Sequence, residues 1–367
     1  MSAVLAVNIG YSPRHAALPP GQEPPRHRLR RLVVTVSVLA LLGAGAAYSV
    51  FHAFRGPAGP GPETGQGVRV FRGAGLGLRG PADVTSAGGR LWITNSAGNS
   101  VTELDTRRAG RRPVIRTGPR YGFLAPGAIA AGQGHVWVAD VVANQITELR
   151  ATDGAVIRTI GKVTSPHSLV LFGNRLWVAN PTANSLYLID ARTGSKVREL
   201  RHDGLRYPSA LAVSRHLLWV ANEAKDTITV LNAVTGAWKS TLRGSRYGLR
   251  QPVAEVASRS TLWVASAAAR TITQISTVTG QPVRIIGGPR YRIGMPAAMA
   301  LADDKLWVLN TIGNSVTEID ARTGRLVTVL AGSTYGFDNP AGISASGRAI
   351  WVAGATSLTR IALPASR

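Results

Sequence analysis

The stretch Leu306-Trp307-Val308-Leu309-Asn310 is the clearest copy of a phrase that occurs seven times along the chain. In every copy the tryptophan stands eleven residues after a proline, and successive copies are 40 to 45 residues apart. The prolines are Pro81, Pro126, Pro166, Pro208, Pro252, Pro296 and Pro340, and the tryptophans are Trp92, Trp137, Trp177, Trp219, Trp263, Trp307 and Trp351. A regular period of this length predicts a repeat architecture.

The residues of each copy alternate in the manner of β-strands. After each proline, larger apolar side chains alternate with small ones, as in Ala-Ala-Met-Ala-Leu after Pro296, and this period of two predicts a first strand, strand A. The tryptophan lies on strand B, and two further runs, such as 315–320 and 326–330, predict strands C and D. Asn or Asp three and seven residues after most tryptophans, and a glycine seventeen residues after five of them, predict the turns between these strands.

Four antiparallel strands per unit and seven units predict an all-β fold, a seven-bladed β-propeller that spans residues 67–367. The seventh unit ends after its strand C, and its missing strand D is found at the other end of the domain, at residues 68–72. We therefore expect residues 68–72 to pair with the strand near Leu358–Ile361 and complete the last blade. This closure leaves no unpaired sheet edge, which would favour aggregation.

The residues before the repeats predict a membrane anchor. Residues 1–31 form a basic segment without periodicity, expected to be disordered and cytoplasmic, and residues 32–54 form an uncharged run long enough to span a membrane as a single helix. Arg26, Arg28, Arg30 and Arg31 precede this run, so the N-terminus should remain inside and the propeller should be extracytoplasmic. Residues 55–66 read as a Pro/Gly linker. The alternative is a signal peptide cleaved at 44–47, which would make the protein secreted.

The composition limits the kinds of partner and of side-chain chemistry that the chain can have. The chain has 42 Lys and Arg against 19 Asp and Glu, a net charge of +23, so its surface attracts anionic partners. The basic residues are dispersed and no recognition helix or RNA-binding motif is present, which argues against a nucleic-acid partner. The chain contains no cysteine, which excludes disulfides and thiolate chemistry. We expect no metal, no cofactor and a monomer.

Residues 176–194 and 306–324 carry a family resemblance. Their Leu-Trp-Val-Ala/Leu-Asn, Asn-Ser and Ile-Asp-Ala-Arg-Thr-Gly segments resemble the YVTN/NHL-type repeats of bacterial exported proteins, which include YncE-like and virginiamycin B lyase-like proteins. The resemblance covers roughly residues 68–367 and implies a propeller fold. Its lyase-like members use His and Glu side chains with a magnesium ion. Here no repeat carries a matching set, since His135, His167, His202 and His216 lie in different units or turns, so no catalytic residue is assigned.

Candidate binding residues lie in the loops between strand D of one blade and strand A of the next. These D–A loops share a face with the B–C loops in a propeller. They repeat an Arg-Tyr pair that could hold a carboxylate- or phosphate-bearing ligand. The candidates are Arg120, Tyr121, Arg206, Tyr207, Arg246, Tyr247, Arg290, Tyr291 and Tyr335. The alternative is that the tyrosines pack between blades while the arginines are merely solvated.

Three polar residues interrupt strand A. Glu255 takes the third position after its proline, where the other copies have Val, Ile, Leu or Met, while His167 and Asp83 take the first and second positions. Each is expected either to have a structural partner or to face the centre of the ring. We expect a membrane-anchored, extracytoplasmic binding or scaffold module for an anionic cell-envelope polymer, a glycan or a protein. The alternative is a diverged lyase-like enzyme with a site on the D–A and B–C loop face, for which these three residues are the acid/base candidates.

Overall fold

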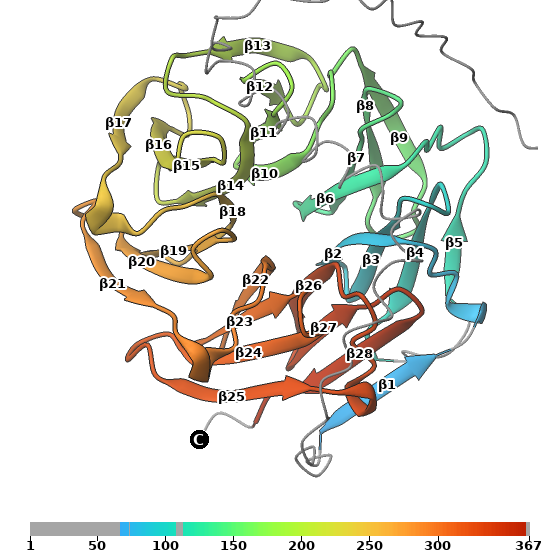
Figure 1. Cartoon of the computed structure of the whole chain (residues 1–367). Coiled ribbons are helices and arrows are strands. Elements are labelled where there is room, and N and C mark those ends of the chain that lie inside the picture. The colour runs from blue at the N-terminus through green and yellow to red at the C-terminus, as the bar shows by residue number, and fades with distance from the viewer. Residues whose placement is uncertain (1–66, 73, 108–112, 365–367) are drawn as a thin grey trace, which may run out of the picture. The chain divides into compact units, whose positions relative to one another are not determined.

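Seven four-stranded antiparallel sheets form a ring in the computed structural model (Figure 1), which describes residues 67–72, 74–107 and 113–364. The predicted all-β, seven-bladed propeller is confirmed. In each of the first six blades the strands lie in chain order from the centre of the ring to its rim, as strands A to D. The predicted segments 1–31, 32–54 and 55–66 lie outside the described residues.

The first four blades contain sixteen strands. They are β2 (Pro81–Ala87), β3 (Arg90–Asn95), β4 (Ser100–Asp105) and β5 (Val114–Arg116) in blade 1, and β6 (Pro126–Gly132), β7 (His135–Asp140), β8 (Gln145–Arg150) and β9 (Val156–Gly161) in blade 2. Blade 3 contains β10 (Ser168–Phe172), β11 (Arg175–Asn180), β12 (Ser185–Asp190) and β13 (Lys196–Arg201), and blade 4 contains β14 (Pro208–Ser214), β15 (Leu217–Asn222), β16 (Thr227–Asn232) and β17 (Trp238–Leu242).

The last three blades follow the same plan. They are β18 (Pro252–Ala257), β19 (Thr261–Ser266), β20 (Thr271–Ser276) and β21 (Pro282–Ile286) in blade 5, and β22 (Pro296–Ala302), β23 (Lys305–Asn310), β24 (Ser315–Asp320) and β25 (Leu326–Ala331) in blade 6. Blade 7 contains β26 (Gly342–Ser346), β27 (Ala349–Ala353), β28 (Ser357–Ala362) and β1 (Val68–Arg72). Short 3-10 helices precede four blades: η2 (Ala74–Leu76), η3 (Ser245–Tyr247), η4 (Pro289–Tyr291) and η5 (Ser333–Tyr335).

The ring closes as the sequence predicts. Strand β1 pairs antiparallel with β28, with Val68 opposite Ile361 and Phe71 opposite Leu358. Phe71 also stacks on Trp351 of the same blade, at 6.1 Å between ring centroids. The last blade therefore joins the two ends of the domain, and Figure 1 shows β1 at the rim beside β28.

The hydrophobic core is divided into seven seams between neighbouring blades. The strands A contact one another around the ring, and β26 contacts β2 to complete it. Each repeat tryptophan is at most 3% exposed and packs with the blade that follows it. Ala210 and Ala212 of β14, for example, face Val264 of blade 5, while Leu211 faces blade 3. Small residues on one side of strand A and large ones on the other let adjacent sheets pack closely.

Each blade begins with a strained corner. The residue before each strand-A proline has a positive φ: Gly80, Ala125, Ser165, Tyr207, Gln251, Met295 and Asn339. In five blades the pairing of strand A also shifts register directly after the proline, as between Pro252 and Ala254. A bulge accommodates a proline, which cannot donate to the ladder. Because the strained corner recurs in every blade, it belongs to the fold and does not mark a site.

Candidate functional site

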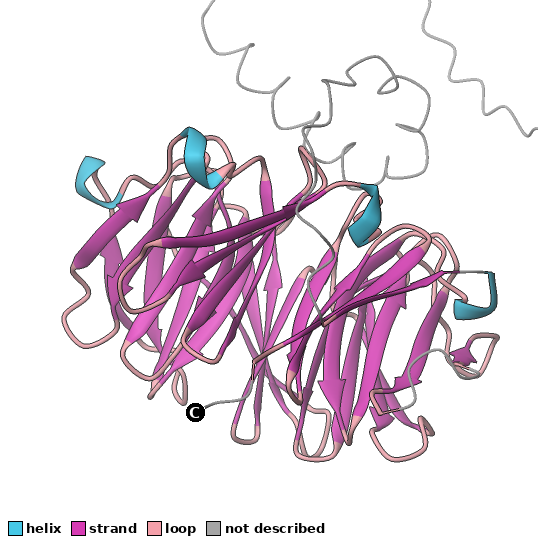
Figure 2. Cartoon of the chain, turned by 90° about the horizontal axis from the view of Figure 1, so that it is seen from below, coloured by secondary structure: helices cyan, strands magenta, loops and turns pink. Residues whose placement is uncertain are grey.

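The D–A and B–C loops lie on the same side of the propeller, here named the loop face, and hydrogen bonds join them. Asn222, three residues after Trp219, accepts from the backbone N–H of Arg206 and donates to Thr229, at 3.3 and 2.9 Å. Four residues further on, Asp226 accepts from the N–H of Gln251 in the D–A loop before blade 5, at 2.7 Å. Equivalent bonds recur in other blades. The structural turn role predicted for these Asn and Asp residues is confirmed, and Figure 2 shows the short helices of the D–A loops on one side of the propeller.

The tyrosines five residues before the strand-A prolines point into the seams. Tyr121, Tyr247, Tyr291 and Tyr335 are each at most 5% exposed and belong to the hydrophobic clusters between blades. The hydroxyls of Tyr247 and Tyr291 donate to the carbonyls of Gly280 and Gly324, at 3.0 and 2.9 Å. Gly280 and Gly324 are turn glycines with positive φ. All four tyrosines therefore pack between blades, and Tyr247 and Tyr291 also tie the D–A loop to the C–D turn.

The arginines of three pairs lie over the rings of their own tyrosines. The Arg120, Arg246 and Arg290 guanidinium carbons are 5.1, 4.9 and 4.8 Å from the centroids of Tyr121, Tyr247 and Tyr291. All three arginines are exposed, so the buried ring supports a solvent-facing charge.

The Arg206-Tyr207 pair is different, because it directly precedes Pro208. Its tyrosine is half-buried, and its φ is 51°. Burial, followed by the negative charge of Glu223, raises the pKa of Tyr207. This pair does not repeat the geometry of the other three.

A dense group of exposed arginines lies on the loops of blades 5 and 6. This group, here named the arginine patch, consists of Arg243, Arg246, Arg250, Arg270, Arg290 and Arg292. The three loops that carry it, 243–251, 267–270 and 287–295, contain no Asp or Glu. Within the described part of the chain, none of the six forms an ion pair.

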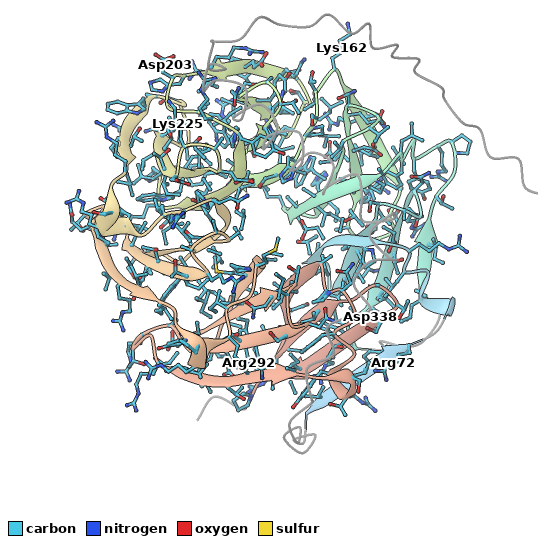
Figure 3. The ribbon with its side chains drawn as sticks, viewed as in Figure 1. Arg72, Lys162, Asp203, Lys225, Arg292 and Asp338 are labelled. Carbon is cyan, nitrogen blue, oxygen red and sulfur yellow. The ribbon has the colours of Figure 1, made fainter. Side chains whose placement is uncertain are left out.

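The loops of the patch touch one another. The N–H of Ala267 donates to the carbonyl of Gln251, at 2.9 Å, and joins loop 267–270 to loop 243–251. Gly287, where the third loop begins, lies against the carbonyl of Arg270. Figure 3 labels Arg292 of the patch, and Asp338 and Asp203 on the D–A loops before blades 7 and 4. The three loops of the patch carry no acidic residue, although Glu223 and Asp226 of the B–C loop of blade 4 accept hydrogen bonds from Gln251 at the edge of the patch, at 2.8 and 2.7 Å.

Many other arginines are held by the fold. Arg116 on β5 pairs with Glu103 and donates to the carbonyl of Asp153 in the next blade, at 2.7 and 2.6 Å. Arg198 on β13 and Arg284 on β21 likewise reach carbonyls in the C–D turns of the blades that follow. These arginines therefore join neighbouring blades at the rim of the ring, and their positive charge is already engaged in contacts within the fold.

Asp83 and His167 bridge different pairs of blades. The Asp83 carboxylate accepts from the N–H groups of Val84 and Ile129, at 2.8 and 3.1 Å, and so joins blade 1 to blade 2. Burial raises its pKa to about 6, although the two N–H groups oppose this. His167 Nδ1 lies 3.2 Å from the carbonyl of Ser209 in blade 4, and burial lowers the pKa of its ring. A neutral imidazole that donates from Nδ1 satisfies this contact.

Glu255 lies in another seam, between blades 4 and 5, and burial raises its pKa well above the usual range. Asp83, His167 and Glu255 thus occupy three different seams, and no hydrogen bond or ion pair joins any two of them in the described residues. The structure does not bring the three acid/base candidates together. Residues 67–72, 74–107 and 113–364 also contain no group of three or more His, Asp or Glu side chains that could hold a metal ion.

Sequence analysis missed a set of buried ion pairs on the strands next to the tryptophans. Glu103 and Glu148 stand directly opposite Trp92 and Trp137 and are almost fully buried. Glu148 lies 2.7 Å from both His135 and Arg158, and Glu103 pairs with Arg90 and Arg116. The signal was a glutamate eleven residues after Trp92 and Trp137, with a basic residue two positions before each tryptophan. The same spacing around Trp307 does not give this pair, because Lys305 pairs with Asp320.

The comparisons with known proteins define the fold. The structure resembles virginiamycin B lyase from Staphylococcus aureus, with a TM-score of 0.70 and 16% identity over 81% of this chain and 99% of that one. It also resembles a streptogramin B lyase (TM-score 0.69, 18% identity, 81% and 97% coverage) and the WD40 repeats of RRP9 (0.67, 13%, 81% and 98%). No protein-family model and no curated protein matches the sequence.

These neighbours confirm the propeller expected from the repeat resemblance. Because they include both lyases and a WD40-repeat protein, the fold alone does not assign an activity. No helix within the described residues has the length and apolar character needed to cross a membrane.

Proposed function

We propose that the chain is a membrane-anchored, extracytoplasmic binding module whose loop face holds an anionic component of the cell envelope, such as an acidic polymer, an acidic glycan or an acidic protein segment. The observation that carries this proposal is the arginine patch, six exposed arginines on three adjoining loops without a carboxylate. Guanidinium groups bind carboxylates and phosphates in a bidentate manner, and a group of them favours polyanions over single anions.

The geometry of the loops supports this assignment. The patch is built on rigid parts, since Tyr247 and Tyr291 anchor their loops in the seams through buried rings and hydroxyl hydrogen bonds. Arginines presented by ordered loops lose less conformational entropy on binding than those on mobile segments. The surface therefore suits a ligand that extends across blades 5 and 6.

A binding assay with charge-matched variants tests the proposal. The full chain in non-ionic detergent is titrated with two probes, polyphosphate and polygalacturonate, at low and high salt. The test variant carries Arg250→Gln, Arg270→Gln and Arg292→Gln. The control carries Arg259→Gln, Arg322→Gln and Arg325→Gln, which remove the same charge from exposed turns at the opposite ends of the strands in blades 5 and 6.

We expect the test variant to bind roughly tenfold more weakly, because three exposed charge pairs contribute about 0.5 kcal/mol each. The control variant should bind like the unmodified chain at moderate salt. Equal weakening of both variants would show attraction by the overall charge alone and would overturn the proposal. A preference for one probe would distinguish phosphate-bearing from carboxylate-bearing partners.

A further inference from the structure

The seam between blades 4 and 5 departs from the other six. At the third residue after the strand-A proline, the other blades carry Val84, Ile129, Leu169, Leu211, Met299 and Ile343, which pack into the seam with the preceding blade. In blade 5 this position is Glu255 on β18. A carboxyl group therefore stands where every other blade has an aliphatic side chain.

The direction of the side chain follows from the pairing of β18. Glu255 lies opposite Val264 on β19, and paired residues share a face of the sheet. Val264 packs with Ala210, Ala212 and Trp219 of blade 4, whereas Ala254 and Trp263 pack with Met299 of blade 6. Glu255 therefore faces blade 4, against the small side of β14.

The carboxyl group has no polar partner in this seam. Both of its oxygens are buried, and neither makes a hydrogen bond or an ion pair within the described residues. The strands packed most extensively on β18 are β14, β15, β19 and β22, and they contain no Asp, Glu, His, Lys, Arg or Tyr.

Ser209 of β14 connects β18 to one titratable group, His167. Its hydroxyl donates to the carbonyl of Pro252, and its own carbonyl contacts His167, at 2.9 and 3.2 Å. Neither contact reaches the Glu255 carboxyl.

We propose that this seam is a proton-dependent contact: Glu255 is a neutral acid while blades 4 and 5 are packed together, and its ionisation loosens β14 from β18. A carboxylate buried without a partner is far less favourable than the neutral acid, so the ionised form selects conformations in which water reaches the seam.

The same seam supports part of the arginine patch. Tyr247 and Leu249, which anchor loop 243–251, belong to the hydrophobic cluster that also contains Ala210 and Val264. Loosening of the seam therefore also frees the loop that carries Arg243, Arg246 and Arg250. This consequence for ligand binding rests on the proposed function, whereas the effect on the seam does not.

The sign of the pH effect follows from the raised pKa of Glu255. Burial lifts this pKa well above 4.5, the value expected in the unfolded chain. The folded state thus holds the proton more tightly, and the stabilisation is fully present below pH 4.5 and is lost as the pH rises toward the folded pKa. In this interval the equilibrium constant of unfolding increases about tenfold per pH unit from this one group.

Two variants separate the effect of the Glu255 carboxyl on stability from that of the other titratable groups. Glu255→Gln keeps the shape and removes the titration, and Met299→Glu places a carboxyl at the equivalent position of the next seam. Urea unfolding of the full chain, followed by tryptophan fluorescence between pH 5 and pH 9, should give a steeper loss of stability for the unmodified chain than for Glu255→Gln. The pKa of Asp83 is also raised, to about 6, but Asp83 is present in both chains and cancels in the comparison.

Hydrogen exchange locates the effect. In the unmodified chain, peptides from β14, β18 and loop 243–251 should exchange faster at pH 8.5 than at pH 6, after correction for the intrinsic rate, while peptides from β26, which carries no titratable side chain, should not. Met299→Glu should transfer this behaviour to β22. Identical pH profiles for the unmodified chain and Glu255→Gln, or loosening spread evenly over all blades, would overturn the proposal.

Anion binding provides a separate readout. If the seam responds to pH but polyphosphate binding does not, the proton-dependent contact stands and its link to the arginine patch fails.

Discussion

Each repeat tryptophan stabilises the boundary between its own blade and the next. Trp177 shows the arrangement most fully, because its ring is buried between blades 3 and 4 and its Nε1 donates to the carbonyl of Ala233, at 2.8 Å. The turn beyond it is equally constrained, since a Cβ on Gly236 would lie 2.9 Å from the Trp177 ring. The tryptophan therefore works as core packing, and its constant position reflects the geometry of the seam.

Trp263 and Trp238 allow the contribution of a buried tryptophan to stability to be compared with that of an exposed one. Trp263 is 1% exposed in the seam between blades 5 and 6, whereas Trp238, the one tryptophan outside the repeat phrase, is 50% exposed on the outer strand of blade 4. We expect Trp263→Ala to lower the free energy of unfolding by about 3–5 kcal/mol through lost burial and a cavity. Trp238→Ala should cost less than about 1 kcal/mol. Equal losses in urea unfolding would contradict the assignment of the tryptophans to the seams.

The strands could be predicted from the sequence more fully than the contacts between their side chains. The period of two, the turn residues and the Pro-to-Trp spacing depend on local sequence, and they predicted the four strands of each blade and the pairing of residues 68–72 with Leu358–Ile361. The pairing of Glu148 with Arg158 could not be predicted in this way. It depends on which residue of strand C faces Trp137, on the bulge between Glu148 and Leu149, and on the reach of an arginine from strand D.

The arginine patch, too, could not be predicted from local sequence alone. Sequence analysis selected Arg246 and Arg290 because they precede tyrosines, yet the structure assigns those tyrosines to packing. Arg270 was missed, because only the fold places the B–C loop of blade 5 against loops 243–251 and 287–295. The absence of acidic residues from all three loops was visible in the sequence, but it gains meaning only once the loops are known to adjoin.

The closing strand is the element on which the integrity of the ring depends. Without β1, the edge of β28 would be unpaired and Trp351 would lose its stacking contact with Phe71. A chain that begins at residue 74 should therefore unfold at a clearly lower temperature than one that begins at residue 66, which retains β1. Both should be compared by calorimetry and by sedimentation, because an exposed strand edge also promotes association. Equal melting temperatures would refute the closure as a source of stability.

At the scale of the whole molecule, the membrane anchor that we propose would decide which compartment the loop face meets. Residues 32–54 carry no charge, and as a helix rising 1.5 Å per residue they would measure about 34 Å, slightly more than the hydrocarbon core of a bilayer. Arg26, Arg28, Arg30 and Arg31 precede this run and only Arg55 follows it directly. By the positive-inside rule, this asymmetry predicts a cytoplasmic N-terminus and an extracytoplasmic propeller.

The absence of cysteine makes this orientation directly measurable. A single cysteine is introduced either at Ala17 or at Ala268, which is exposed in the B–C loop of blade 5, and intact cells are treated with a membrane-impermeant maleimide. We expect Ala268→Cys to be labelled in intact cells and Ala17→Cys only after lysis. Loss of the Ala17→Cys site from the mature protein would instead show cleavage near 44–47 and a secreted propeller. Labelling of Ala268→Cys only after lysis would place the arginine patch in the cytoplasm and remove the cell envelope as the source of its anionic partner.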